Sequence, residues 1–184
     1  MARRTHQHSG TDMSQYRRAR YPGGLYFFTV VTHHRDPLFS DESRIGIVRE
    51  AFRKIMTLRP FQMDAIVILP DHLHCIWRMP EGDADYASRW REIKKATSRQ
   101  FDTPTNHRNE RMVWQRRFWE HAIRDEADWR KHMDYIHYNP VKHGLVNRPD
   151  EWRWSSFRSA VRKGWYEPSW GAGEPATIAG MDCE

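Results

Sequence analysis

The stretch that decides the fold is Pro70-Asp71-His72-Leu73-His74-Cys75-Ile76-Trp77. After the turn signal Pro70-Asp71, its residues are typical of a β-strand, in which successive side chains point to opposite faces of the sheet. His72 and His74 therefore share one face, whereas Leu73 points the other way, into a core. Two imidazoles on one face could bind one metal ion or one phosphate, although such a pair is more often exposed or hydrogen-bonded.

Five further elements surround this strand. A nearly continuous run of β-branched and aromatic residues predicts a central strand that is covered on both faces. Capping residues followed by apolar residues at helical spacing predict two helices. The six elements are strand 25–32, helix 41–58, strand 61–69, strand 72–79, helix 86–101 and strand 113–124. The order β-α-β-β-α-β predicts an α+β fold of the ferredoxin-like (RRM-like) class with a central antiparallel sheet.

A further helix is predicted over residues 126–139, with Asp125 as its N-cap. Its buried stripe at helical spacing consists of Trp129, Met133 and Ile136. The stripe places this helix against the sheet, so its flanking residues are expected at the edge of the core.

Two tyrosines on this helix have different positions. Tyr135 and Asn139 are four residues apart and lie on the flank of the buried stripe, whereas Tyr138 falls nearly opposite it. If one tyrosine works beside a metal site at the edge of the core, it is Tyr135. Pro140 removes a backbone donor, which predicts that the helix ends or kinks at Asn139.

The composition favours a globular protein that binds nucleic acid. The chain has 184 residues, 39% of them hydrophobic, which is enough to bury a core. Its formal net charge of +6 and its abundant aromatic residues make nucleic acid the leading partner. Most of its basic residues are Arg, which binds phosphate bidentately, although a GC-rich genome would also favour Arg codons.

The location and domain organisation follow from the ends of the chain. No apolar run approaches the length of about 18 residues that a membrane span needs, and the basic N-terminus lacks the apolar segment of a signal peptide. With only two cysteines, a cytoplasmic protein is expected, without a membrane partner. A nucleic-acid partner would make it nucleoid-associated. We predict a flexible basic arm over residues 1–20, one domain over 21–146, and a Trp-rich tail over 147–184 that packs on it. About the last ten residues of the tail are expected to be disordered.

The helix over residues 86–101 carries a row of cations on its polar face. Because few acids balance them, contact with phosphates is favoured over a merely solvated face. Arg17 and Arg18 in the arm could also touch phosphates or belong to a solvated tail. The residues predicted to bind DNA are Arg89, Arg91, Lys94, Lys95, Arg17 and Arg18.

The two constellations together resemble the single-tyrosine HUH transposases, and within them the REP-associated tyrosine transposases. The resemblance covers about residues 16–170 and includes several motifs in the same order. They are Gly23-Gly24 with Tyr26-Phe27-Phe28-Thr29-Val30, then 69–77 with His72-Leu73-His74, 88–95, Trp114-Gln115, 118–121, and Asp134-Tyr135-Ile136-His137-Tyr138-Asn139-Pro140-Val141-Lys142-His143-Gly144.

This resemblance implies a chemistry and a substrate. It makes residues 21–146 an HUH single-tyrosine transposase domain, with a catalytic helix added after the ferredoxin-like unit. His72 and His74 would hold Mg²⁺ or Mn²⁺, with Asn139 as the candidate oxygen ligand. Tyr135 would be the nucleophile that forms a 5′-phosphotyrosine intermediate. The implied substrate is single-stranded DNA at hairpin-forming palindromic (REP-like) repeats, and the resemblance favours a monomer over a homodimer.

Two other functions remain open at this stage. The first is a ferredoxin-like DNA- or RNA-binding module without catalysis, in which the histidines contact phosphates and Tyr135 packs. The second is a metal-dependent phosphodiesterase that uses water as its nucleophile, which would form no covalent adduct with DNA. Both histidines and the tyrosine are present, which favours the strand-transferring nuclease.

Overall fold

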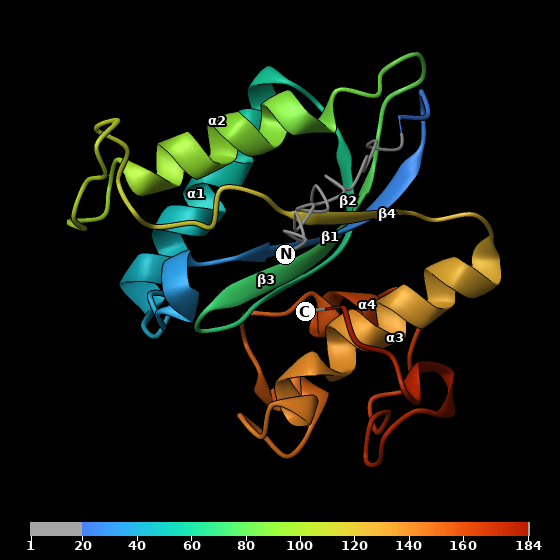
Figure 1. The fold of residues 1–184 in the computed structure, drawn as a ribbon. Coiled ribbons are helices and arrows are strands. Elements are labelled where there is room, and N and C mark those ends of the chain that lie inside the picture. Colours follow the sequence, from blue (N-terminus) through green and yellow to red (C-terminus); the bar gives the residue numbers. More distant parts are fainter. Residues whose placement is uncertain (1–19, 184) are drawn as a thin grey trace, which may run out of the picture.

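A four-stranded antiparallel sheet runs through the middle of the structure, a computed structural model that describes residues 20–183 (Figure 1). The strand order is β2-β3-β1-β4, which is the ferredoxin-like order and confirms the predicted fold class. The strands are β1 Leu25–Val31, β2 Gln62–Ile68, β3 His72–Arg78 and β4 Trp119–Ala122. The helices are α1 Glu42–Leu58, α2 Tyr86–Ser98, α3 Glu126–Lys142 and α4 Phe157–Arg162, with short 3₁₀ turns at His33–Arg35, Pro149–Glu151 and Ala176–Ile178.

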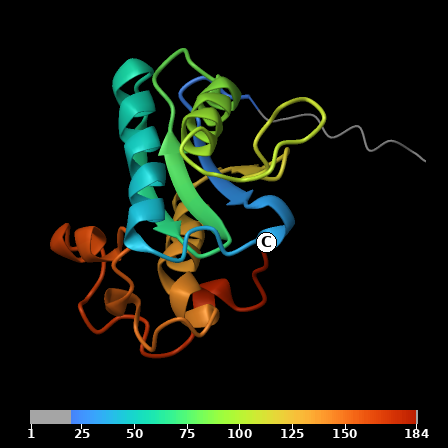
Figure 2. The same cartoon turned by 90° about the vertical axis from the view of Figure 1, so that its left-hand side faces the viewer.

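The sheet is covered on both faces, as the sequence predicts for its central strand (Figures 1 and 2). Alternate residues of β1 and β3 enter one core, which α1 and α2 cover. The remaining residues of these strands enter a second core, beneath α3 and the C-terminal segment. Leu73 lies in the first core, so His72 and His74 face α3. The described helices include none that is long and apolar enough to cross a membrane.

The fourth strand is shorter than predicted. Only Trp119–Ala122 pairs with β1, and the preceding residues of the expected strand 113–124 form a single bridge, between Trp114 and Thr32. Lys94 of α2 explains part of this difference. Its Nζ donates to the carbonyl oxygens of Gln115 and Arg116, at 2.5 and 3.3 Å, so these carbonyls are held toward α2.

Helix α3 continues past the point where the sequence predicts its end. It includes Pro140 and reaches Lys142, with the His143 amide donating to the Asn139 carbonyl oxygen. Asn139 and Pro140 are both buried, so packing outweighs the backbone hydrogen bond that proline cannot make. One more turn of helix brings Lys142 to the same side as Tyr135, seven residues earlier.

The C-terminal segment covers the outer face of α3 and corrects the predicted extent of its buried surface. Asp134 is buried there because Tyr166 Oη and Thr177 Oγ1 each donate to its carboxylate at 2.7 Å. The structure describes this segment up to residue 183, which includes most of the residues for which the sequence predicts disorder. Ile178 is only 3% exposed, and the carbonyl of Cys183 accepts a hydrogen bond from Thr29. Since this segment supplies a second buried surface, α3 is buried on more than its predicted stripe.

His137, buried between α3 and this segment, is expected to make the fold acid-sensitive. Burial, with a smaller effect of Arg130, lowers its pKa to about 3, against about 6.5 for an unfolded chain. The stability contributed by the neutral imidazole is therefore complete above about pH 6.5 and is lost as the pH falls toward 3, because the unfolded state binds the proton first. As the pH falls below about 6.5, the free energy of unfolding of the wild type should decrease more steeply than that of His137→Gln, by up to about 1.4 kcal/mol per pH unit. Urea denaturation at several pH values measures this difference.

The matched control for this measurement is His107→Gln, which changes an exposed loop histidine in the same way. Its free energy of unfolding should follow the wild-type pH dependence. Parallel curves for wild type and His137→Gln between about pH 7.5 and about pH 5 would contradict the assignment.

Candidate active site

His72 and His74 lie side by side on β3, on the face that α3 covers. Their ring centroids are 4.8 Å apart, and the two residues are 1% and 0% exposed. Their partners on β1 are Val31 and Thr29, so the pair sits at one end of the two central strands. The strand geometry that the sequence predicts is therefore present, with both rings inside the protein.

Each histidine is oriented through its Nδ1 atom. His72 Nδ1 lies 2.6 Å from Asp71 Oδ1, and His74 Nδ1 lies 2.9 Å from Thr29 Oγ1. The Thr29 hydroxyl gives its proton to the Cys183 carbonyl at 2.6 Å, so it accepts from His74 Nδ1–H. We assign both imidazoles as Nδ1–H tautomers, which leaves the Nε2 lone pairs facing the site.

The surroundings favour a neutral imidazole at His74 and an ionised carboxylate at Asp71. Burial, followed by neighbouring His72, His143, Lys142 and Arg35, holds the pKa of His74 well below its usual value. Burial opposes ionisation of Asp71, but hydrogen bonds from His72 and Arg35 bring its pKa to about 2. A neutral imidazole is the form that ligates a metal ion.

The residues present fit a divalent cation. Among the described residues, His72 Nε2, His74 Nε2 and both amide atoms of Asn139 are buried without a hydrogen-bond partner. Buried polar atoms are normally paired, so a missing ligand explains such a cluster. Asn139 lies one helical turn from Tyr135, which contacts His74, and one turn from His143, which contacts His72. This spacing places Asn139 on α3 between the two residues that contact the histidines. Two imidazoles and one oxygen can ligate a divalent metal ion and leave coordination positions for substrate.

Tyr135 is next to this pair, and Tyr138 is not. The Tyr135 ring lies 5.2 Å from that of His74, and its hydroxyl accepts hydrogen bonds from Lys142 Nζ and the Cys183 amide, both at 3.3 Å. Tyr138 instead contacts Trp170 of the C-terminal segment. The helix therefore presents to the histidines the tyrosine that the helical projection selected.

A second histidine cluster lies nearby. The ligand atoms of His121, Asp128 and His132 lie within 4.8 Å of one another. Here the carboxylate of Asp128 already holds both rings, at 2.8 Å from His121 Nε2 and 3.1 Å from His132 Nδ1. The Phe27 ring separates this cluster from His74. Because one nitrogen of each ring already pairs with Asp128, we assign this cluster a structural role.

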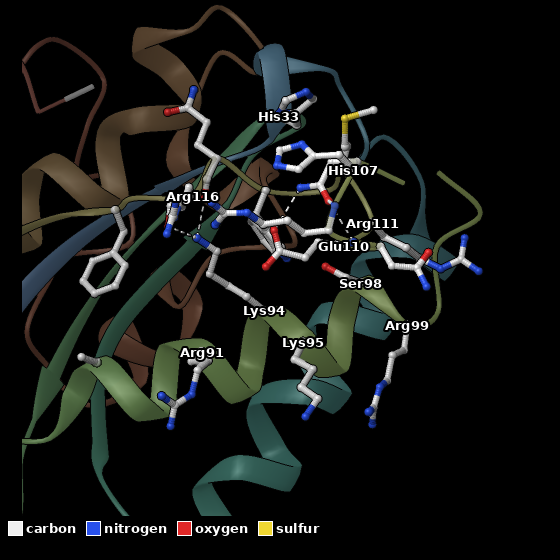
Figure 3. Close-up of a pocket in the computed structure, with 18 residues that line it drawn as sticks. His33, Arg91, Lys94, Lys95, Ser98, Arg99, His107, Glu110, Arg111 and Arg116 are labelled. Carbon is white, nitrogen blue, oxygen red and sulfur yellow. Dashed lines mark hydrogen bonds between the residues drawn. The ribbon is translucent and has the colours of Figure 1, made fainter. Parts of the chain in front are cut away.

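A basic cavity of about 980 Å³ lies between α2 and the loop over residues 106–116 (Figure 3). Lys94 points from α2 toward this loop, whereas Arg91, Lys95 and Arg99 extend away from the loop on the outer side of the helix (Figure 3). The loop adds cations that the sequence pattern did not single out. The basic residues lining the cavity are His33, Arg91, Lys94, Lys95, Arg99, His107, Arg108, Arg111 and Arg116. This concentration of positive charge suits a phosphate backbone.

Arg89 does not belong to this surface, which corrects one predicted DNA contact. Its side chain is 3% exposed, and its guanidinium donates to the carbonyl oxygens of Arg59, Pro60 and Asp85. It also pairs with Asp83 at 2.7 Å and thereby holds the pKa of that carboxyl below its usual value. Helical projection alone put Arg89 with the other cations, but the α1–β2 connection and the loop before α2 enclose it. Arg17 and Arg18 lie outside the described residues.

Arg89→Met is therefore expected to destabilise the fold. Loss of the buried cation leaves three carbonyls and a carboxylate without their donor, which should lower the free energy of unfolding by about 3 kcal/mol. The matched variant Arg91→Met changes a side chain that is 71% exposed and should cost less than about 0.5 kcal/mol. Urea denaturation compares the two. An Arg89→Met protein of wild-type stability with weakened DNA binding would restore the original prediction.

Three supporting residues were missed in the sequence. Asp71 and Lys142 both lie within the motifs. Asp71 directly precedes His72, and Lys142 follows Tyr135 by seven residues, or two helical turns, so both positions could have indicated their roles. Thr29 gave no such signal. It reaches His74 only because β1 and β3 pair in this register.

Comparison with known proteins identifies similar families and structures. The family model described as "Transposase IS200 like" matches residues 23–139. A REP-associated tyrosine transposase of Escherichia coli (strain K12) is 46% identical over 159 residues, covering 86% of this chain and 91% of that protein. A relative from Haemophilus influenzae, provisionally given the same description, is 41% identical over 175 residues, covering 91% of this chain and 99% of its own length.

A solved structure shares the whole architecture. It is described as a REP-associated tyrosine transposase bound to a REP hairpin, and it superposes with a TM-score of 0.76. It is 42% identical in sequence, and the match covers 90% of this chain and 96% of that one.

Proposed function

Because this chain belongs to the IS200-like transposase family, among its REP-associated tyrosine transposases, we propose that it cleaves and rejoins single-stranded DNA at hairpin-forming palindromic repeats. The single observation that carries the proposal is the convergence of four groups from one chain. The unpartnered Nε2 atoms of His72 and His74 lie on β3 beside the Tyr135 ring of α3, and the buried, unpartnered amide of Asn139 is one helical turn after Tyr135.

His72, His74 and Asn139 would hold a divalent cation, Mg²⁺ or Mn²⁺. When bound, such an ion withdraws charge from phosphate oxygens and so stabilises the charge that develops during phosphoryl transfer. The chain itself orients the imidazole rings that would bind the ion. Asp71 and Thr29 fix the ring orientations before any ion or DNA arrives.

Tyr135 would attack the scissile phosphorus. Its phenolic oxygen forms a bond to phosphorus, the phenolic proton is lost, and the bond from phosphorus to the 3′ oxygen breaks. The products are a 5′-phosphotyrosine and a free 3′-OH, and the same 3′-OH can reverse the step without ATP because the bond energy is conserved. Lys142, whose ammonium is 3.3 Å from the phenolic oxygen, stabilises negative charge on that oxygen in both directions.

The basic cavity provides a place for the hairpin. The similar solved transposase is bound to a REP hairpin, and we carry that class of partner over to this chain. Here the cations of α2 and of the loop over 106–116 surround a cavity large enough to admit backbone phosphates. All four candidate active-site groups come from one chain, which supports a monomer. A DNA palindrome as substrate is consistent with a protein of the nucleoid.

A covalent adduct tests this proposal directly. Labelled single-stranded DNA carrying a palindromic hairpin from near the gene is incubated with the protein and Mn²⁺, then run on a denaturing protein gel. A label that migrates with the protein in Mn²⁺, and is absent with a chelator, is the expected result. DNA cleavage without an adduct would indicate a water-using phosphodiesterase. DNA binding without adduct or cleavage, for several metal ions and several hairpins, would indicate a non-catalytic binding module.

A further inference from the structure

We infer that Trp119 is a stacking platform for an unpaired DNA base next to the scissile phosphate. The inference rests on the proposed function and names the group that receives the single strand between the hairpin and Tyr135. Trp119 is 43% exposed and is one of four large apolar side chains that the described residues expose. Covering an indole ring removes a large apolar surface from water, which is favourable. An exposed indole beside the candidate active site is therefore a suitable surface for a ligand to stack on.

The strand register places Trp119 in line with the active site. Thr29 on β1 pairs with His74 on one side and with Trp119 on the other. Directly paired residues of antiparallel strands point to the same face of the sheet, so Trp119 shares the face of the histidines. With neighbouring strands about 4.8 Å apart, its backbone lies about 10 Å from that of His74. An extended nucleotide can bridge this separation.

Aromatic contacts hold the indole in place. The centroid of the Phe27 ring lies 5.7 Å from that of Trp119, 5.5 Å from that of His74 and 6.0 Å from that of Tyr135. Phe27 therefore contacts both the indole and the candidate catalytic residues. The ring of His121 is parallel to the indole within 9°, at 6.0 Å. His121 is in turn fixed by its hydrogen bond to Asp128. A preorganised aromatic surface loses little entropy when a base stacks on it.

The surrounding charges suit a single strand. Arg116 and Arg117 are exposed just before β4, and Arg124 is exposed just after it. Arg116 also lines the basic cavity, together with Phe118, on the α2 face of the sheet. Trp119, the next residue, turns to the α3 face, so β4 separates the cavity from the histidines. A strand leaving a hairpin in the cavity would cross β4 and meet an aromatic ring between cations, the combination that binds unpaired nucleotides.

Fluorescence anisotropy with the full-length protein tests this inference, using a labelled hairpin with and without single-stranded extensions. Trp119→Ala should weaken binding of the extended hairpin about tenfold or more and leave the blunt hairpin within twofold. Trp119→Phe should retain most of the affinity because it keeps a stacking ring. Leu58→Ala, which changes another exposed apolar side chain, on α1, is the matched control and should bind both probes normally.

Abasic substitutions in the DNA identify the base. One abasic position beside the cleaved phosphate should weaken wild-type binding by a similar factor and abolish the difference between wild type and Trp119→Ala. Equal weakening of both hairpins by Trp119→Ala, or additive effects at every abasic position, would overturn the inference. These measurements need no cleavage. Wild type that stacks the base without forming the adduct would contradict the proposed function and leave the platform standing.

Discussion

Tyr135→Phe is expected to abolish the covalent protein–DNA adduct and DNA cleavage, by about a thousandfold or more, while hairpin affinity stays within threefold. The substitution removes only the phenolic oxygen. The ring keeps its contacts with Phe27 and His74, so the fold and the DNA-binding cavity are unchanged. Quantitative gels with Mn²⁺ measure adduct and cleavage, and anisotropy measures binding.

Tyr138→Phe is the matched control, because it removes the same atom three residues along the same helix. Its ring contacts Trp170 rather than the histidines, so most of the activity should remain. Equal loss of activity in both variants would refute the assignment of the nucleophile from the helix face. Full activity of Tyr135→Phe would mean that another group, or water, attacks the phosphorus.

His74→Ala is expected to weaken Mn²⁺ binding by about a hundredfold or more and to remove metal-dependent cleavage. His74 is fully buried, with its Nε2 unpaired and its Nδ1 held by Thr29. Its replacement leaves His72 and Asn139 as the remaining ligands of the assigned site. Isothermal titration calorimetry with Mn²⁺ measures the metal affinity independently of DNA, and circular dichroism checks that the variant folds.

His121→Ala separates this site from the second histidine cluster. The variant removes one ring of the cluster with Asp128 and His132 but leaves His72 and His74 in place, so Mn²⁺ affinity should be unchanged. If His121→Ala lost the metal and His74→Ala kept it, the two assignments would have to be exchanged.

Much of the fold was predictable because local rules governed it. The predicted N-cap Asp125 accepts the expected backbone amide, and the β-α-β-β-α-β order produced the expected sheet. The misses have non-local causes. Lys94 holds carbonyls of the predicted fourth strand, and the buried environment of Asn139 and Pro140 carries α3 one turn further.

The candidate site was predictable to the extent that its members share one element. His72 and His74 are two residues apart on a strand, which places both side chains on one face. Asn139 is four residues after Tyr135 on a helix, which places it one turn away. Arg89 shows where this reasoning fails. The helical projection gives its direction, but two loops enclose it, the α1–β2 connection with Arg59 and Pro60 and the β3–α2 loop with Asp83.

By itself, the sequence determined the fold class, the paired histidines and the choice of Tyr135 over Tyr138, because backbone periodicity fixes which side chains share a face. Only the tertiary structure decided which polar atoms are paired and which are left for a ligand. Thr29 and His74 are 45 residues apart in the chain, and Asp134 and Thr177 are 43 apart. Hydrogen bonds and burial of this kind arise when distant segments pack together, so no local pattern encodes them.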